Sequence, residues 1–419
     1  MMRPYQRLLC FNTWLNDFAG FLLIFAVGRL LAEQGAGLMK MGLVGGGFSL
    51  VMALASIVFG HVSDRVSQRW MITLASLLLA AAPIGYLITD NEMVRLCGWY
   101  WLSAAAGGML YPPVYAWLSA GDGGGSGNGA RSAKPQAARR ITHTIIWFCM
   151  AWNLGIISGN LFGGWQFDRF GAEAPIYWAA VLALLNVPLW QLAARWRRLE
   201  ALAAPVVAEL TDNTPNPDAG REQRLSAGFV KLAWLANLGG AFSMSVVLHL
   251  FPALAVELRI PSDRHGSIIG LTRALVIVTY RVMWRSTFWH QRFGAALASQ
   301  LIGVAGMLCL ARAQGTAALI FGLTLLAQLV GFNYFASLYY STHGSNLSRR
   351  GGAMGLYEAT LGLGFAAGSA LGGVLAERLH QGRLPYYLGA GVIFLFALAQ
   401  SALYWSHVRP LRRGLASQD

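Results

Sequence analysis

The feature that most constrains this chain is a succession of apolar stretches of about 20 residues, separated by polar or Gly- and Pro-rich segments. A helix of that length crosses the hydrocarbon core of a bilayer and satisfies its own backbone hydrogen bonds there. The sequence therefore predicts an all-α polytopic membrane protein with twelve transmembrane helices. The expected spans are residues 8–30, 40–62, 70–89, 94–118, 141–164, 174–197, 228–251, 263–285, 293–312, 316–341, 352–376 and 384–406.

The composition agrees with lipid as the main solvent. Of the 419 residues, 56% are hydrophobic and 12% are charged, whereas an ordinary soluble domain has roughly 25% charged residues. The formal net charge of +14 does not indicate nucleic-acid binding, because the basic residues are scattered between apolar stretches. The four cysteines lie within apolar stretches without paired spacing. We therefore expect neither a disulfide framework nor a metal site.

The distribution of basic residues predicts the orientation. If the N-terminus is cytoplasmic, most of the 32 lysines and arginines fall in cytoplasmic segments, as the positive-inside rule requires. We therefore expect a multi-pass protein of the cell membrane with both termini in the cytoplasm.

Two of the predicted spans carry the same glycine spacing, half a chain length apart. Gly155, Gly159, Gly163 and Gly164 correspond to Gly364, Gly368, Gly372 and Gly373. Together with a polar segment near the midpoint, this repeat predicts an N-terminal six-helix bundle (1–198), a cytoplasmic linker (199–226) and a C-terminal six-helix bundle (227–419). Such glycines let a neighbouring helix approach closely, so we assign them to helix packing. An open alternative is that the packed surface is the one along which the two halves rock.

The loop after the second span carries the most specific motif. Its sequence, Gly60-His61-Val62-Ser63-Asp64-Arg65-Val66-Ser67-Gln68-Arg69, resembles the loop signature of the major facilitator superfamily of secondary transporters, with Ser67 where a glycine is usual. The resemblance implies two pseudo-symmetric six-helix bundles. It also implies a cytoplasmic gating loop of Gly60, Asp64, Arg65 and Arg69, in which Asp64 engages the N-terminus of the eleventh span, where a carboxylate is favoured. The alternative is that Arg65 and Arg69 only follow the positive-inside rule.

Three further positions leave the direction of transport and its coupling open. The fifth span is similar to the family's antiporter signature, which points to export, but Asn160 replaces its proline. Ser103 stands where many proton antiporters of the family carry an arginine. In the second half, Phe288 stands where the corresponding loop is expected to carry an aspartate.

Ionisable residues at membrane depth are costly and are functional candidates by default. Asp17 and Arg273 lie near the middle of their predicted spans, and Glu358 lies nearer the cytoplasmic side. Arg273 keeps its proton and therefore needs a carboxylate, an anionic substrate or water beside it. We expect Asp17 to be its partner and to titrate during transport, so that proton and substrate compete. The alternative is a fixed ion pair that links the halves.

Other candidates follow from helix faces and from the resemblance. Thr13 and Asp17 share one face of the first span, and Asn12 and Asn16 share the adjoining face. The resemblance implies that the first, fourth, seventh and tenth spans line a central cavity. Tyr115 and His249 lie on these spans and are further candidates, although a structural role is expected for His249. The substrate or proton-coupling candidates are Asp17, Arg273, Glu358, Thr13, Asn16, Tyr111, Trp152, Asn153, Asn237, Asn333 and Tyr334.

These features predict a secondary active transporter of a small organic solute that works by alternating access, with proton coupling left open. No cofactor is expected, because the chain lacks the phosphate loop of an ATP-driven pump. It also lacks the motifs of a membrane hydrolase or metalloenzyme, so we do not expect an enzyme. The expected partners are the solute, the bilayer and, if coupled, protons; the chain is expected to be a monomer without nucleic-acid partners. The open alternative is a non-transporting sensor or assembly partner on the same scaffold.

Overall fold

The computed structural model of the chain describes residues 2–63, 65–120, 135–203, 217–344 and 350–416, and every regular element within them is a helix. The first half comprises α1 (Pro4–Glu33), α2 (Leu38–Val62), α3 (Gln68–Ile88), the π-helical η1 (Val94–Tyr100), α4 (Trp101–Ala120), α5 (Pro135–Phe170) and α6 (Ala174–Ala203). The second half comprises α7 (Pro217–His249), α8 (Phe251–Glu257), α9 (Ser262–Arg285), α10 (Phe293–Ala311), α11 (Thr316–Gly344), α12 (Arg350–Arg378), α13 (Leu384–Leu403), the π-helical η3 (Tyr404–Val408) and α14 (Arg409–Ala416).

The helices match the predicted spans closely. Eleven helical segments of the described residues are long and apolar enough to cross a membrane. The remaining predicted span, 94–118, corresponds to η1 and α4, whose apolar character is reduced by two internal prolines and by tyrosines. Three helices extend past the predicted apolar spans: α5 begins at Pro135, α6 continues to Ala203 and α7 begins at Pro217. These extra turns are polar, so hydropathy does not mark them.

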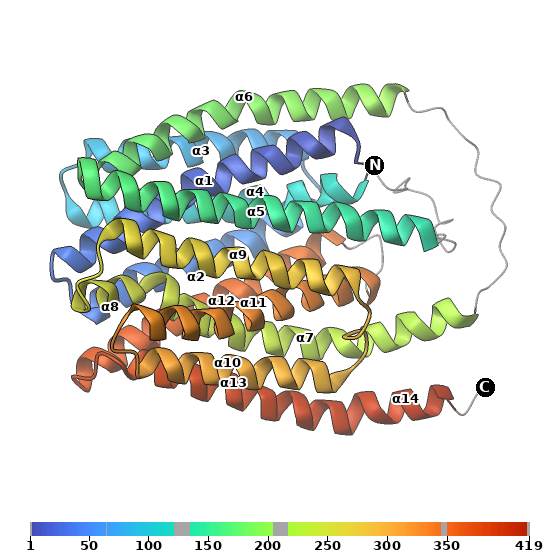
Figure 1. Cartoon of the computed structure of the whole chain (residues 1–419). Coiled ribbons are helices and arrows are strands. Elements are labelled where there is room, and N and C mark those ends of the chain that lie inside the picture. Colours follow the sequence, from blue (N-terminus) through green and yellow to red (C-terminus); the bar gives the residue numbers. More distant parts are fainter. Residues whose placement is uncertain (1, 64, 121–134, 204–216, 345–349, 417–419) are drawn as a thin grey trace.

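The long helices lie side by side and run in roughly the same direction through the molecule (Figure 1). In the first half α1 packs on α5 and α6, and α4 packs on α2 and α3. In the second half α7 packs on α12 and α13, and α11 packs on α9 and α10. The same set of neighbours occurs twice, which confirms two pseudo-symmetric bundles of six long helices: the N-terminal bundle, α1 to α6, and the C-terminal bundle, α7 and α9 to α13, with the short α8 between its first two long helices.

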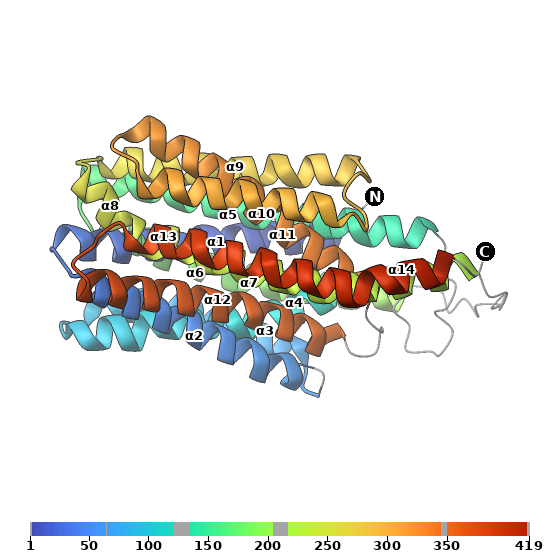
Figure 2. The same cartoon turned by 90° about the horizontal axis from the view of Figure 1, so that it is seen from below.

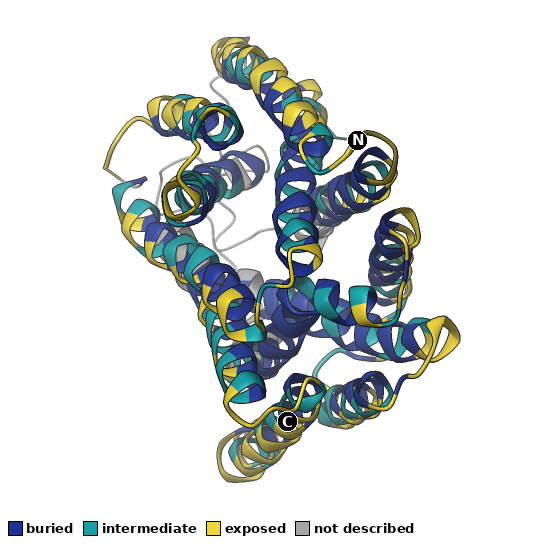
Figure 3. Ribbon diagram, turned by 90° about the vertical axis from the view of Figure 1, so that its left-hand side faces the viewer, coloured by how far each residue is buried: buried dark blue, intermediate teal, exposed yellow. Residues whose placement is uncertain are grey.

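The start of α1 and the end of α14 lie at the same end of the molecule (Figures 1 and 2). We call this the terminal end. The opposite end, where α1 ends at Glu33 and α2 begins at Leu38, is the distal end. In the view onto the distal end, buried residues line the helix faces that meet, and exposed residues lie on the periphery (Figure 3). Many exposed side chains are large and apolar, as a lipid-facing surface requires; they include Leu43, Leu50, Leu54, Leu74, Leu185 and Leu395.

The two bundles meet along two helix pairs, α2 with α12 and α5 with α9. Glycines bring the backbones together in both pairs: a Cβ on Gly42 would meet the Ser369 carbonyl oxygen, and one on Gly266 would meet that of Asn160. The predicted glycines divide between two kinds of contact. Gly155, Gly159 and Gly163 face α1, and Gly364 and Gly368 face α7, whereas Gly372 approaches Leu250 and Pro385. All six therefore lie at contacts within one bundle, while Gly164 and Gly373 approach the other bundle.

Candidate functional site

A cavity with about 1300 Å³ of empty space lies between the two bundles. Its wall is contributed by α1, α2, α3, α4 and α5 of the N-terminal bundle and by α7, α9, α11 and α12 of the C-terminal bundle. Most of the wall is apolar. The polar and ionisable residues that line it are Asn16, Asp17, Ser49, Ser103, Tyr111, Tyr115, Trp152, Asn237, Arg273, Asn333, Tyr334 and Glu358.

Nine of the eleven candidates named from the sequence line this cavity, and two do not. Thr13 is buried one helical turn nearer the terminal end than Asp17, where α1 is packed against its neighbours. Asn153 is fully buried, and its amide donates to the Cys149 carbonyl oxygen at 2.9 Å. Helical spacing assigned both residues to the correct stretch of helix but not to the cavity wall.

Asp17 is held by neutral donors from its own bundle. The Tyr111 hydroxyl donates to Asp17 Oδ1 at 2.6 Å, and the Asn16 amide donates to the Tyr111 oxygen at 3.2 Å. Asp17 Oδ2 is buried and has no hydrogen-bond partner. One carboxylate oxygen is therefore held by α4, and the Trp152 side chain on α5 also lies near the carboxylate.

Glu358 takes part in a contact that crosses between the bundles. Tyr115, one turn after Tyr111 on α4, donates to Glu358 Oε1 on α12 at 3.0 Å. The Tyr115 and Tyr334 hydroxyl oxygens are 3.1 Å apart. Since Tyr115 gives its proton to Glu358, Tyr334 on α11 is the donor in the second bond. This chain of three side chains, which we call the tyrosine–glutamate contact, joins α4 to α11 and α12 on the terminal side of Asp17.

Arg273 is buried, with 5% of its surface exposed, and its Nε has no hydrogen-bond partner. The expected Asp17–Arg273 ion pair is absent: among the described residues, no ion pair within 4 Å involves either side chain. The two residues belong to different bundles, and the cavity separates the helices that carry them. Asp17 instead accepts its hydrogen bond from Tyr111.

The two predicted asparagines of the C-terminal bundle differ in their contacts. Asn333 accepts from the Gln300 amide at 3.0 Å and donates to the Ala236 carbonyl oxygen at 2.9 Å, so it ties α10, α11 and α7 together. Asn237 Nδ2 is buried, and the Tyr357 hydroxyl on α12 lies near the Asn237 side chain. Asn333 is therefore held by two neighbouring helices, and both asparagines line the cavity.

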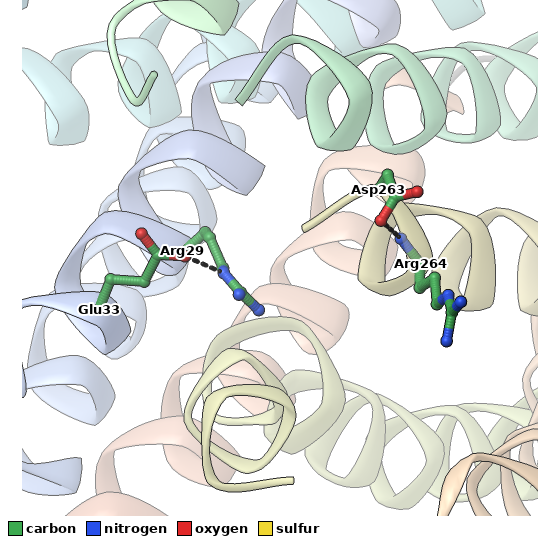
Figure 4. A network of polar contacts seen from close by, with 4 residues as sticks. All are labelled: Arg29, Glu33, Asp263 and Arg264. Carbon is green, nitrogen blue, oxygen red and sulfur yellow. Dashed lines mark hydrogen bonds and ion pairs between the residues drawn. The ribbon is translucent and has the colours of Figure 1, made fainter. Parts of the chain in front are cut away.

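Aromatic side chains of α1, α8 and α9 pack together near the distal end. The His265 ring lies 4.9 Å from the Phe25 ring and 5.2 Å from the Phe251 ring, centroid to centroid. Two polar contacts at this end stay within single helices. Arg29 pairs with Glu33 at 2.8 Å along α1, and the Arg264 backbone donates to Asp263 at the start of α9 (Figure 4).

A second polar contact between the bundles lies at the distal end. The Met39 backbone N–H, in the first turn of α2, donates to Glu377 Oε2 near the end of α12 at 2.8 Å. A carboxylate at a helix N-terminus is stabilised by the unpaired N–H groups and by the helix dipole. Glu377 thus caps α2 from the other bundle, a contact that no sequence pattern indicated.

The loops at the terminal end were named from the resemblance. Asp64 lies outside the described residues, so its expected contact with α12 is not described. Gly60 is buried at the end of α2, and Arg65 and Arg69 lie at the surface, where Arg69 Nε donates to Gln191 of α6 at 3.2 Å. In the corresponding loop of the second half, Phe288 is 48% exposed. The buried Trp289 beside it donates to the Met283 carbonyl oxygen at 2.8 Å and anchors that loop.

Sequence reasoning missed the contribution of α2 to the cavity and, apart from Glu358, that of α12. Phe48, Ser49 and Met52 come from α2, and Leu361 and Phe365 come from α12. Apolar residues of a transmembrane helix face lipid, neighbours or a cavity with equal ease. No sequence signal therefore distinguishes these positions.

Comparison with known proteins gives a consistent result. The profile described as Major Facilitator Superfamily matches residues 9–347. A Methanocaldococcus jannaschii protein named as an uncharacterized MFS-type transporter is 20% identical over 379 residues, which cover 88% of this chain and 91% of that protein. The crystal structure of the human organic anion transporter MFSD10 (TETRAN) is similar with a TM-score of 0.63 and 15% identity, over 95% of this chain and 100% of the other. The POT family transporter PepTSo is similar with a TM-score of 0.69 and 12% identity, over 97% and 98%.

Proposed function

The chain belongs to the Major Facilitator Superfamily of membrane transport proteins, and we propose that it is a secondary active transporter that moves a small organic solute by alternating access. The observation that carries this proposal is the cavity itself. Both bundles contribute to its wall, and it holds two carboxylates and one guanidinium at membrane depth. Such groups are costly in lipid and are retained at sites of solute or ion passage.

Alternating access requires contacts between the bundles that open at one end at a time. The tyrosine–glutamate contact holds α4 to α11 and α12 on the terminal side, and Glu377 holds α12 to α2 on the distal side. Rocking of one bundle against the other breaks one of these contacts while the other persists. The glycine contacts of α2 with α12 and of α5 with α9 provide the surfaces on which the bundles move.

We further propose that transport is coupled to protons through Asp17 and Glu358. Each carboxylate accepts a hydrogen bond from a tyrosine of α4, and each lines the cavity. Protonation of Glu358 removes the negative charge that strengthens the bond from Tyr115. A proton that arrives there weakens the contact on the terminal side. Asp17, with one unpartnered oxygen, is the group at which proton and substrate compete.

The same proposal assigns boundaries and orientation. Residues 1–198 and 227–419 form the two moving bundles, and residues 199–226 link them. The protein acts as a monomer in the cell membrane with its terminal end in the cytoplasm. Support for this orientation is the position of the basic residues, since Arg65, Arg69, Arg285 and Arg292 all lie at the terminal end, as the positive-inside rule requires.

Reconstitution into liposomes tests the function. A panel of organic solutes is offered with and without an imposed pH gradient, and solute uptake and proton flux are recorded together. We expect gradient-dependent uptake of at least one solute, and loss of the gradient dependence in Asp17→Asn. Solute binding without flux under every gradient would instead identify a sensor on a transporter scaffold and overturn the proposal.

A further inference from the structure

We infer that the cavity binds organic anions with an apolar body, and that the acidic group of the substrate binds Arg273. This inference rests on the proposed function for the step from binding to transport. The binding step stands on the cavity wall alone.

The first argument is the uncompensated charge of Arg273. A guanidinium stays protonated in a protein, so this residue carries its charge wherever the bundles move. Its Nε is buried without a hydrogen-bond partner, and among the described residues no carboxylate lies within 4 Å of it. A buried charge without a partner is costly, whereas one that binds an anion in a planar, two-bonded arrangement is stabilised. The missing partner is therefore an anion that enters the cavity.

The second argument is that the two carboxylates of the cavity do not need a cationic substrate. Asp17 and Glu358 each accept a hydrogen bond from a tyrosine hydroxyl. A carboxylate can also lose its charge by taking up a proton, which a guanidinium cannot do by losing one. A cationic substrate would leave Arg273 uncompensated, and an anionic one satisfies it. The charges of the wall thus favour an anion over a cation.

The third argument concerns the rest of the wall. Asn237, on the same bundle as Arg273, adds a polar amide to the cavity wall. The remaining surface is mostly apolar and lies on both bundles; it includes Phe21, Ile24, Phe48, Met244, Leu248 and Phe365. Ligand sites of this kind combine a few placed polar groups with a large apolar wall. The complementary molecule has a carboxylate or sulfonate at one end and an aromatic or aliphatic body.

The test measures binding to the purified full-length protein in detergent. The probes are 2-naphthoate, 2-naphthalenesulfonate and octanoate, each compared with a neutral amide of the same body. Thermal unfolding followed by fluorescence reports stabilisation, and titration gives the apparent Kd. We expect stabilisation by at least one anion, with its amide at least tenfold weaker. No stabilisation by any of the three anions, or equal stabilisation by the amides, would overturn the inference.

Substitutions locate the site. Arg273→Gln is expected to weaken anion binding at least tenfold without changing the affinity of the amide, and Arg273→Lys to retain part of the anion preference. Arg281→Gln is the matched control, since it removes the same charge two turns further along α9, outside the cavity wall. Arg273→Gln without ligand is expected to unfold at the same or a higher temperature, because it removes an unpartnered buried charge. Undiminished anion binding by this folded variant would refute the assignment.

Failure of the inference and failure of the proposed function give different results. Anion binding that depends on Arg273, without flux in liposomes, supports the site and contradicts transport. Gradient-driven flux of neutral or cationic solutes, without anion binding, supports transport and contradicts the site.

Discussion

Glu377 provides the most direct test of how the two bundles are held together at the distal end. Its carboxylate caps α2 from the other bundle, with 2.8 Å between Glu377 Oε2 and the Met39 nitrogen. Glu377→Gln keeps an oxygen acceptor but removes the charge, which is worth about 0.3 to 1 kcal/mol at a helix N-terminus. This energy changes the ratio of distal-open to distal-closed molecules by a factor of about 2 to 5, since RT is about 0.6 kcal/mol. We therefore predict a two- to fivefold rise in this ratio.

Electron paramagnetic resonance distance measurements can follow that ratio. Spin labels at Asp90→Cys and Gln314→Cys, which are exposed at the distal end of the two bundles, report their separation. The four native cysteines are replaced in this background. Glu33→Gln is the control, because Glu33 lies at the same end but pairs with Arg29 of its own helix. An unchanged distance distribution in Glu377→Gln, or the same shift in Glu33→Gln, would refute the capping argument.

Three further predictions concern the cavity and the loop after α9. Tyr115→Phe removes two hydrogen bonds between the bundles, each worth about 1 kcal/mol, so spin labels at the terminal end should report a larger fraction of open molecules. Tyr111→Phe removes hydrogen bonds within one bundle and should leave that fraction unchanged. Asp17→Asn should remove the dependence of uptake on a pH gradient, and undiminished dependence in liposomes would contradict a titrating role. Trp289→Ala should cost about 3 to 5 kcal/mol of stability and lower the melting temperature clearly, whereas Phe288→Ala, at an exposed neighbour, should change it little.

The fold could be predicted because each span satisfies its own backbone and differs from its loops in hydropathy. The ends of α5, α6 and α7 could not be predicted, because their outer turns are polar and hydropathy does not mark them. Most of the candidate site could also be predicted, because polar residues within the apolar spans are few, and nine of the eleven named line the cavity. The hydrogen-bond partners of those residues could not be predicted. The choice of Tyr111 over Arg273 as the partner of Asp17 depends on how the bundles are placed.

The tyrosine–glutamate contact and the Glu377 contact differ in what can release them, and this difference bears on how the proposed cycle is controlled. Glu358 lines the cavity, so a proton that arrives there acts directly on the bond from Tyr115. Glu377 does not line the cavity and holds a backbone N–H at the distal end, so a bound solute makes no contact with it. A ligand shifts an equilibrium only by its differential interaction with the two states. On the proposed mechanism, the occupied cavity therefore acts directly on the tyrosine–glutamate contact, while the cap on α2 contributes a bias at the distal end that does not depend on the bound solute.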